Sequence, residues 1–342
     1  MNDRVYLRRY LAPLDPWLSR PDVTDILVNR PGEVWVETLS GETTRFDAPQ
    51  LTEVDLTRLA RQVAGAASQG VNREQPLLST SLPDGARVQI IGPPATRSGL
   101  VLAIRKHAIS DLSMEQLQRT GLFDAALETG AAAREDRALE AMLAASDVMG
   151  FLSAAVKRRK TIVLSGGTSS GKTTLLNALV KQVDPRERLV VIEDAPEIQL
   201  EHANAIGLIA VRGDMGEARV GAEDLLQASL RMRPDRILLG ELRGAEAFAF
   251  LRAVNTGHPG SITTVHADSP EGAIDQITML ALLSGVDMGW AAIQAYARRV
   301  IDVVVQLKRI DGRRLVSEVV FNPTRPPSEP IDLAAAARAR RS

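Results

Sequence analysis

The sequence predicts an α/β protein, with a C-terminal doubly wound domain and a smaller α+β domain at the N-terminus. Three observations favour this fold. Residues 161–165 are a β-branched apolar run that enters a glycine-rich turn, and a helical pattern leaves that turn. Later strand-like runs alternate with helical stretches, as in a sheet covered on both faces. The first third of the chain instead shows short strands joined by tight turns, which is typical of antiparallel pairing.

The composition is that of a soluble globular protein and excludes several kinds of site. The chain has 342 residues, enough for about two domains, and 45% of them are hydrophobic. It has no cysteine, which excludes disulfides and thiolate metal sites. The formal net charge is -1 and aromatic residues make up 4%, so no dedicated nucleic-acid surface is evident. Because no apolar run could span a bilayer and no signal core is present, we expect a cytoplasmic protein with at most peripheral membrane contact.

Residues 1–127 are predicted to form the N-terminal α+β domain. Two helices are expected, at residues 4–11 and 55–67. Four strands are expected, at residues 25–29, 33–37, 87–91 and 100–106. Pro13 and Pro16 end the first helix, because proline lacks the N–H that a helix needs. The second pair of strands is expected to flank the turn signal at residues 83–85, so an antiparallel sheet with helices is expected.

The rest of the chain is divided into a linker, the doubly wound domain and a tail. Residues 128–146 are rich in Ala, Glu and Arg and are expected to be a linker with helical character. Residues 147–322 are assigned to the doubly wound domain, and residues 323–342 to a poorly ordered tail. In this domain we expect a helix at residues 151–160 and strands at residues 189–193, 237–240 and 261–265. A hairpin around Asp311 and Gly312 is expected to follow.

The glycine-rich turn matches the G-x-x-x-x-G-K-[ST] phosphate loop in the strand–turn–helix context that this motif requires. Glycine lets the backbone curl until its N–H groups converge on an anion, and the next helix points its positive end there. The Lys172 ammonium can reach the β- and γ-phosphates, and the Thr173 hydroxyl can bind Mg²⁺. The loop residues expected to bind are Gly166, Gly167, Thr168, Ser169, Ser170, Gly171, Lys172, Thr173 and Thr174. The sequence therefore predicts ATP and Mg²⁺ as cofactors; the alternative is an ordinary surface loop rich in Gly and Ser.

Acidic side chains follow two of the expected strands. Glu193 and Asp194 stand at the end of the first strand, with Glu197 just beyond them. Glu241 follows the second, next to Gly240, where many phosphate-loop enzymes place an aspartate that holds the Mg²⁺ shell. Because ligands bind at the carboxyl ends of strands in a doubly wound sheet, these acids are expected to face the nucleotide. Solvated acids at strand ends are the alternative.

The two glutamates are assigned different roles. Hydrolysis needs a carboxylate that orients or deprotonates water, while other groups hold Mg²⁺ and the γ-phosphate. Glu193 follows three apolar residues and is expected to be held rigidly, so we expect it to orient the water. Glu241 takes the place of the missing aspartate and is assigned to the Mg²⁺ shell with Thr173 and Asp194, partly through water.

A later segment, residues 257–267, contains two of the 4 histidines, and its His266 stands at a strand end. A histidine there either senses a γ-phosphate or packs in the core. The order of phosphate loop, acid cluster, Gly-Glu strand and double-histidine strand resembles the secretion traffic ATPase superfamily, in particular the hexameric ATPases of type IV secretion systems. Residues 25–37 resemble an N-terminal signature of that subfamily, and residues 84–87 and 103–106 resemble its two arginine segments.

This resemblance implies a RecA-like C-terminal domain and a homohexameric ring, with nucleotide between the two domains of each subunit. It places Glu193, Asp194 and Glu197 in an acidic box. It places Glu241 in the Walker B motif and implies that His266 reads the γ-phosphate. The function it implies is ATP hydrolysis that powers a secretion machine, beside inner-membrane and cytoplasmic components at the cytoplasmic face of the inner membrane.

Arg87 and Arg105 lie in the two arginine segments, and we expect them to stabilise the transferring phosphate across a domain or subunit boundary. Surface salt bridges are their alternative role. Ser169 stands where glycine is common in this superfamily, so the backbone there must accept a less permissive residue. A pilus-type or type II secretion ATPase, a DNA-translocating motor and a non-catalytic scaffold ring stay open as alternatives. The intact Lys172 and Thr173 count against the scaffold ring.

Overall fold

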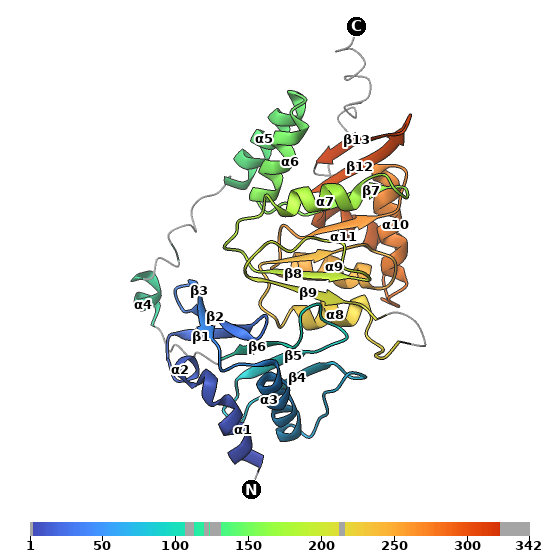
Figure 1. The fold of residues 1–342 in the computed structure, drawn as a ribbon. Helices are drawn as coiled ribbons and strands as arrows, with labels where there is room; N and C mark the ends of the chain where they lie inside the picture. Colours follow the sequence, from blue (N-terminus) through green and yellow to red (C-terminus); the bar gives the residue numbers. More distant parts are fainter. Residues whose placement is uncertain (1–2, 107–112, 120–122, 124–130, 212–215, 322–342) are drawn as a thin grey trace.

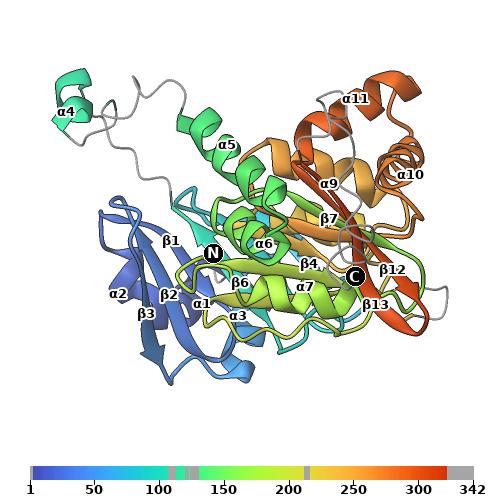
Figure 2. The same cartoon turned by 90° about the horizontal axis from the view of Figure 1, so that it is seen from above.

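The computed structural model describes residues 3–106, 113–119, 123, 131–211 and 216–321. In these residues a six-stranded sheet is followed by a seven-stranded sheet, and the first lies below the second in Figure 1. Helix α4 (Met114–Arg119) stands apart from both sheets and buries none of its side chains (Figure 2). The predicted tail at residues 323–342 lies outside the described residues.

The first sheet is antiparallel throughout, with strand order β3-β2-β1-β6-β5-β4. Its strands are β1 (Val23–Val28), β2 (Gly32–Thr38), β3 (Thr43–Ala48), β4 (Leu77–Ser81), β5 (Arg87–Ile91) and β6 (Val101–Arg105). The helices beside it are α1 (Asp3–Leu11), the 3₁₀ helix η1 (Ala12–Leu14), α2 (Asp15–Leu18) and α3 (Glu53–Ala66). Helix α3 begins where the Thr52 hydroxyl accepts a hydrogen bond from the Asp55 N–H, an N-cap. Leu7 of α1 and Leu56 of α3 pack with Ile26 of β1 in one core.

The second sheet has strand order β13-β12-β7-β11-β10-β8-β9, and among its strands the β12–β13 pair is antiparallel while the others are parallel. Its strands are β7 (Ile162–Gly166), β8 (Leu189–Glu193), β9 (Ala205–Ile209), β10 (Arg236–Leu239), β11 (Ile262–Val265), β12 (Val303–Ile310) and β13 (Arg313–Phe321). One face packs against α5 (Ala131–Ala144), α6 (Val148–Lys157) and α7 (Lys172–Val180). The other face packs against α8 (Ala222–Ser229), α9 (Glu246–Asn255), α10 (Pro270–Leu282) and α11 (Trp290–Val300).

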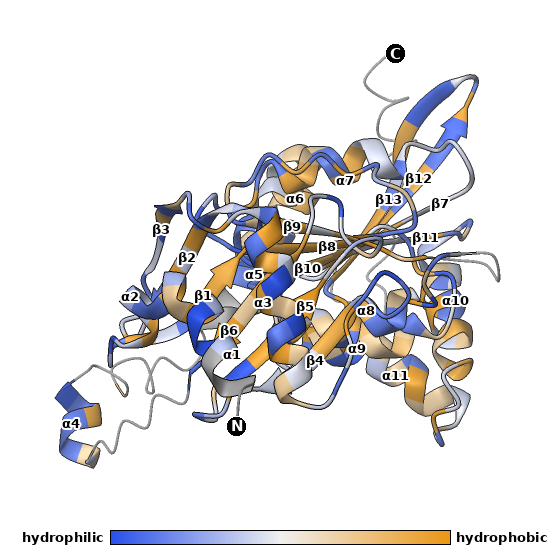
Figure 3. Ribbon diagram, turned by 60° about the horizontal axis from the view of Figure 1, so that its bottom comes forward, coloured by the Kyte–Doolittle hydropathy of each residue, from blue (hydrophilic) through white to orange (hydrophobic). Residues whose placement is uncertain are grey.

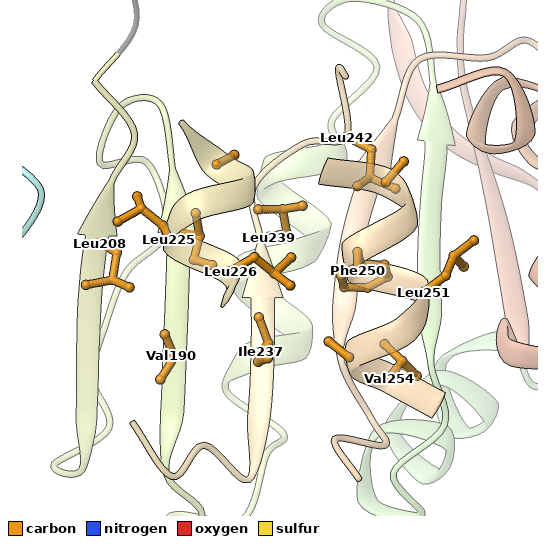
Figure 4. Packing of buried hydrophobic residues seen from close by; sticks show 14 of the residues in the cluster. Val190, Leu208, Leu225, Leu226, Ile237, Leu239, Leu242, Phe250, Leu251 and Val254 are labelled. Carbon is orange, nitrogen blue, oxygen red and sulfur yellow. The ribbon is translucent and has the colours of Figure 1, made fainter. Parts of the chain in front are cut away.

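Alternate residues of the central strands belong to different cores. On β8, Val190 packs with α8 and α9, whereas Val191 packs with α6 and α7. On β10, Ile237 and Leu238 repeat this alternation. Because successive side chains of a strand point to opposite faces, a continuous apolar run needs cover on both sides. Figure 4 shows α8 and α9 over the face that carries Val190 and Ile237. The outer end of the β12–β13 hairpin is mostly hydrophilic by contrast, with a few apolar residues (Figure 3).

The two sheets share a core along one edge. One face of the first sheet is covered by α1 and α3. Its other face carries Leu27, Ile91 and Ala103, which are buried in the same cluster as Leu208 of β9 and Leu226 of α8. The first sheet is therefore held at the β9 edge, and three strands separate β9 from the phosphate-loop strand β7.

The predicted fold class is confirmed, with an antiparallel first sheet and a largely parallel second one. Strand β8 has the predicted bounds, and the hairpin at Asp311 and Gly312 is β12–β13. Strands β3, β4 and β9 have no counterpart in the sequence prediction. The turn at residues 83–85 joins β4 to β5, a pairing that the prediction of strands at 87–91 and 100–106 missed. Most of the predicted linker forms α5, whose Leu139 is buried against α6, while the proposed domain boundaries remain predictions.

Candidate functional site

A cavity of about 460 Å³ lies at the carboxyl ends of β7, β8, β10 and β11, beside the start of α7. Its polar lining is Thr168, Ser169, Lys172, Thr173, Glu193, Asp194, Glu197, Glu241, Arg243, Thr264 and His266. Parallel α/β sheets bind their ligands at this edge. Every residue that lines the cavity lies between residues 168 and 266, so the first sheet does not contribute to its wall.

The phosphate loop joins β7 to α7 through a strained path. Gly171 has φ +102° and Ser169 has φ +58°, so both adopt left-handed backbone conformations. The conformation suits glycine but costs a serine about 1–2 kcal/mol. A Cβ atom at Gly166 would lie 2.7 Å from the carbonyl oxygen of Leu307, so only glycine fits there. The loop therefore places the N-terminus of α7, with its free N–H groups, at the wall of the cavity.

The Lys172 side chain is aimed along the loop into the cavity. The residue is 8% exposed, and its Nζ donates hydrogen bonds to the carbonyl oxygens of Gly166 at 2.7 Å and Gly167 at 3.1 Å. Nζ also lies 3.4 Å from Nδ1 of His266. Burial lowers the pKa of Lys172, and the negative charge of Glu241 opposes this effect. The two carbonyl groups fix the ammonium where a phosphate on the loop would meet it.

Glu241, His266 and Arg243 form a linked group on the facing wall. Nε2 of His266 lies 2.5 Å from Oε1 of Glu241. The Arg243 guanidinium pairs with the same carboxylate, and its Nη1 lies 3.3 Å from Oδ2 of Asp194. The hydrogen bond to Glu241 raises the pKa of Arg243. The fold thus brings the expected Walker B and histidine side chains to one place, next to Lys172.

Glu193 stands at the tip of β8 and is held from two sides. The residue is 5% exposed, and its Oε1 accepts hydrogen bonds from the N–H groups of Glu197 at 3.0 Å and Ile198 at 2.8 Å. Its other oxygen pairs with the guanidinium of Arg97, which comes from the first half of the chain. The rigid hold expected for Glu193 is present, and Arg97 is part of it.

The oxygen atoms on the cavity wall fit the preferences of Mg²⁺. Oγ1 of Thr173 donates to Oε2 of Glu197 at 3.2 Å, and the carboxylates of Asp194 and Glu241 line the same cavity. Within the described ranges no group of three or more His, Cys, Asp or Glu side chains could hold a metal by itself. Mg²⁺ in nucleotide sites typically takes one or two protein ligands and completes its shell with water and phosphate oxygens. The Thr173 hydroxyl and these carboxylates are suitable for such a shell.

Arg87 and Arg105 lie at a different place. They are directly paired on β5 and β6 and line a second hollow of about 350 Å³ with Arg231. Nε of Arg105 donates to Oδ1 of Asp25 at 3.0 Å. Arg231 precedes β10, so this hollow lies toward the amino-terminal edge of the second sheet, whereas the cavity lies at the carboxyl edge. One chain therefore does not bring these two arginines to its own phosphate loop.

Two further charged residues of the site have no role in the sequence prediction. Arg243 stands two positions after Glu241, and this spacing in an extended segment is a usable signal for a shared site. Arg97 has no such signal, because it reaches Glu193 only through the pairing of its loop with β9. Of the predicted loop residues, Thr168, Ser169, Lys172 and Thr173 line the cavity, whereas Gly166, Gly167, Ser170, Gly171 and Thr174 do not, and Thr174 is exposed. The described helices include none that is long and apolar enough to cross a membrane.

Comparisons with known proteins agree on one family. Residues 9–319 match the family described as Type II/IV secretion system protein. The chain is 37% identical over 328 residues to the type IV secretion system protein VirB11 of Bartonella quintana, covering 92% of each chain. It is 41% identical over 317 residues to the type IV secretion system protein PtlH of Bordetella pertussis, covering 91% of this chain and 93% of that protein. The crystal structure of the VirB11 ATPase from the Brucella suis type IV secretion system, in complex with sulphate, matches with a TM-score of 0.85 and 35% identity over 93% of this chain and 99% of that chain.

Proposed function

We propose a function on the premise that this chain belongs to the Type II/IV secretion system protein family. It is an ATPase of the VirB11 group and acts as a motor of a bacterial type IV secretion system. Its ATP hydrolysis powers assembly of the secretion machine or transfer of substrates through it. The observation that carries the proposal is the cavity where Lys172, Glu241 and His266 meet at the end of a parallel sheet.

The phosphate loop and Lys172 hold the nucleotide. The N–H groups at the start of α7 and the Lys172 ammonium together favour the β- and γ-phosphates of ATP. His266 lies within 3.4 Å of Lys172 and 2.5 Å of Glu241. With ATP bound, His266 would contact the γ-phosphate and connect that phosphate to the Glu241 carboxylate. The Brucella suis relative was solved with sulphate, a tetrahedral anion like the phosphate group proposed here.

The carboxylates divide into a Mg²⁺ group and a water-orienting group. Thr173 would bind Mg²⁺ directly, and Glu241 and Asp194 would hold its shell partly through water. The chemistry that Mg²⁺ would supply there is neutralisation of the charge that develops on the phosphates. Glu193 orients the attacking water. This role is supported by the two backbone N–H groups that donate to its Oε1 and hold the carboxylate rigidly. Arg243 keeps the Glu241 and Asp194 carboxylates in one arrangement.

The complete site is built between subunits of a homohexamer. Arg87 and Arg105 form a positively charged hollow that suits an anion, yet it faces away from the phosphate loop of the same chain. In a ring, a heterologous contact brings one subunit's first sheet against the next subunit's cavity. The two arginines then stabilise the transferring phosphate in the neighbouring site. The protein works at the cytoplasmic face of the inner membrane, beside the membrane and cytoplasmic components of the machine.

A phosphate-release assay combined with a size measurement tests this function. Purified protein should release phosphate from ATP with Mg²⁺, and specific activity should rise with protein concentration as rings assemble. Light scattering with and without nucleotide should show a hexamer in the concentration range where activity is full. A stable ring that binds ATP without releasing phosphate would make the protein a scaffold. Full activity from a demonstrable monomer would contradict the site between subunits.

A further inference from the structure

We infer that Arg97 is a positioning residue that ties the first sheet to the catalytic edge of the second, by holding Glu193 and the loop at residues 194–198. This inference rests on the proposed function, because it concerns the acids of the same site. Arg97 does not line the cavity. It acts through Glu193 and through the backbone of the loop that carries Asp194 and Glu197.

The backbone around Arg97 is paired with the outer strand of the second sheet. The Ile209 N–H donates to the Ala95 carbonyl at 2.9 Å, and the Arg97 N–H donates to the Gly207 carbonyl at 3.0 Å. Between them, Thr96 and Leu208 form an antiparallel bridge. Residues 95–97 therefore extend the second sheet beyond β9, although they belong to the loop after β5. A shift of the first sheet relative to the second must move Arg97 or break these hydrogen bonds.

Gly207 leaves the space through which the Arg97 side chain passes. A Cβ atom at Gly207 would lie 2.4 Å from Cδ of Arg97 and 2.7 Å from its Nε. These atoms are in the middle of the side chain, so a methyl group there would force the guanidinium onto another path. Gly207 does not have a left-handed backbone conformation, so alanine would fit its φ angle and would act by steric contact alone. This position offers a way to displace Arg97 without removing its charge.

The guanidinium joins both sides of the acidic loop. It pairs with Glu193, and its Nη1 donates to the Ile198 carbonyl at 2.8 Å. Oε1 of Glu193 in turn accepts from the N–H groups of Glu197 and Ile198. The side chains of Arg97 and Glu193 are 18% and 3% exposed, and burial lowers the pKa of Arg97. A buried carboxylate needs such a partner, because an unpaired buried charge is strongly unfavourable.

The hold on this loop also sets the positions of acids on the other side of the cavity. The loop held by Arg97 and Glu193 places Glu197, whose Oε2 lies 3.2 Å from Thr173 Oγ1. It also places Asp194, which lies 3.3 Å from Arg243. Arg97 therefore couples the position of the first sheet to the acids around the phosphate loop. An ion pair with a purely structural role would stabilise the fold without setting the geometry of these acids.

The test uses the full-length protein and the variants Arg97→Ala, Gly207→Ala and their double variant. The matched control is Arg73→Ala, which removes an exposed ion pair to Glu217, also between the two halves of the chain. The first measurement is amide hydrogen exchange at Glu197 and Ile198 in nucleotide-free protein. The second is kcat and KM for ATP, with thermal melting to confirm that each variant is folded.

We expect Arg97→Ala and Gly207→Ala each to speed exchange at these two amides by about tenfold or more, since local opening becomes easier. Each should lower kcat by roughly tenfold to 10²-fold, because misplacement of catalytic groups by about 1 Å costs that much, with KM changed less than about threefold. The double variant should be no worse than Arg97→Ala, since both changes act on one contact. Arg73→Ala should behave as the wild type.

Three results would overturn the inference. They are unchanged exchange in both single variants, a loss of kcat in the double variant that equals the product of the two single losses, or a rise of kcat in Arg97→Ala. Should Arg97→Ala fail to fold, Gly207→Ala decides the question with the same readouts. Exchange is measured without nucleotide, so its outcome is independent of hydrolysis. A wild-type protein that releases no phosphate would instead contradict the proposed function.

Discussion

The cavity at the phosphate loop and the hollow at Arg87 and Arg105 differ in charge and in construction. The cavity at the carboxyl edge of the second sheet carries the carboxylates of Glu193, Asp194, Glu197 and Glu241. The second hollow is lined by Arg87, Arg105 and Arg231 and by no carboxylate. Nucleotide hydrolysis needs both kinds of surface, acids for Mg²⁺ and water and cations for the phosphate charge. Lys172 and Arg243 already give the cavity cations of its own, and we propose that Arg87 and Arg105 of a neighbouring subunit complete it.

The Lys172→Ala substitution should have the largest effect, and it concerns the cavity alone. Lys172 is a cation of the phosphate loop itself, and its Nζ contacts the Gly166 and Gly167 carbonyls. Its loss should lower turnover by at least about 10²-fold and weaken ATP binding, because a preorganised charge at the phosphate is removed. Phosphate release and titration with a fluorescent ATP analogue measure the two effects.

The control for this substitution is Lys181→Ala, at the far end of α7. Lys181 is half exposed and pairs with Glu201, so its removal should leave turnover and melting within error of the wild type. Near-normal turnover in Lys172→Ala would contradict the assignment of the cavity as the phosphate site, since the phosphates would then bind elsewhere.

Substitutions of the two glutamates test the separate roles that are proposed for them in the cavity. Glu193→Gln should lower kcat by about 10²-fold or more while ATP–Mg²⁺ still binds, because the amide keeps the shape but is a far weaker base. Glu241→Gln should lower turnover and also raise the Mg²⁺ concentration needed for half-maximal rate. Steady-state rates over a Mg²⁺ series distinguish them. If Glu241→Gln traps bound ATP and Glu193→Gln loses Mg²⁺ coupling, the two roles are exchanged.

The smallest expected effect is that of Ser169→Gly in the phosphate loop. Ser169 has φ +58°, a conformation that costs a serine about 1–2 kcal/mol, and glycine relieves it. Glycine loses about 0.5–1 kcal/mol through greater freedom of the unfolded chain, so a net gain of roughly 0.5–1 kcal/mol in unfolding free energy is expected. Urea denaturation measures the gain, and turnover should stay within about twofold. A destabilised variant would show that the serine side chain supports the loop.

The cavity was largely predictable from the sequence because its parts are local. The phosphate loop is recognised from the spacing of its glycines. Glu193, Glu241 and His266 each follow a strand that ends at the same sheet edge. Strand β8 is fully buried and strongly apolar, so its bounds are clear. Strand β3 has one buried residue and is largely polar, and it leaves no comparable pattern.

The junction between the two halves was not predictable. Strand β9 is a short apolar segment with a glycine in its middle, and this pattern does not distinguish a strand from a loop. The role of Gly207 depends on the path of Arg97, 110 positions earlier in the chain. The separation of Arg87 and Arg105 from Lys172 depends on which edge of the second sheet the first sheet contacts. These are tertiary pairings, and no local pattern encodes them.

A mixing experiment with two variants tests the site between subunits most directly. Lys172→Ala should be inactive through its own cavity, and Arg105→Ala through the cavity of its neighbour, each by on the order of 10³-fold. When the two variants are mixed in equal amounts and allowed to reassemble, about a quarter of the heterologous contacts should combine an intact phosphate loop with an intact arginine. The account predicts recovery of phosphate release toward that fraction. If the mixture stays as inactive as its components, while exchange between differently labelled subunits shows mixed rings, the two hollows belong to one chain and the account is contradicted.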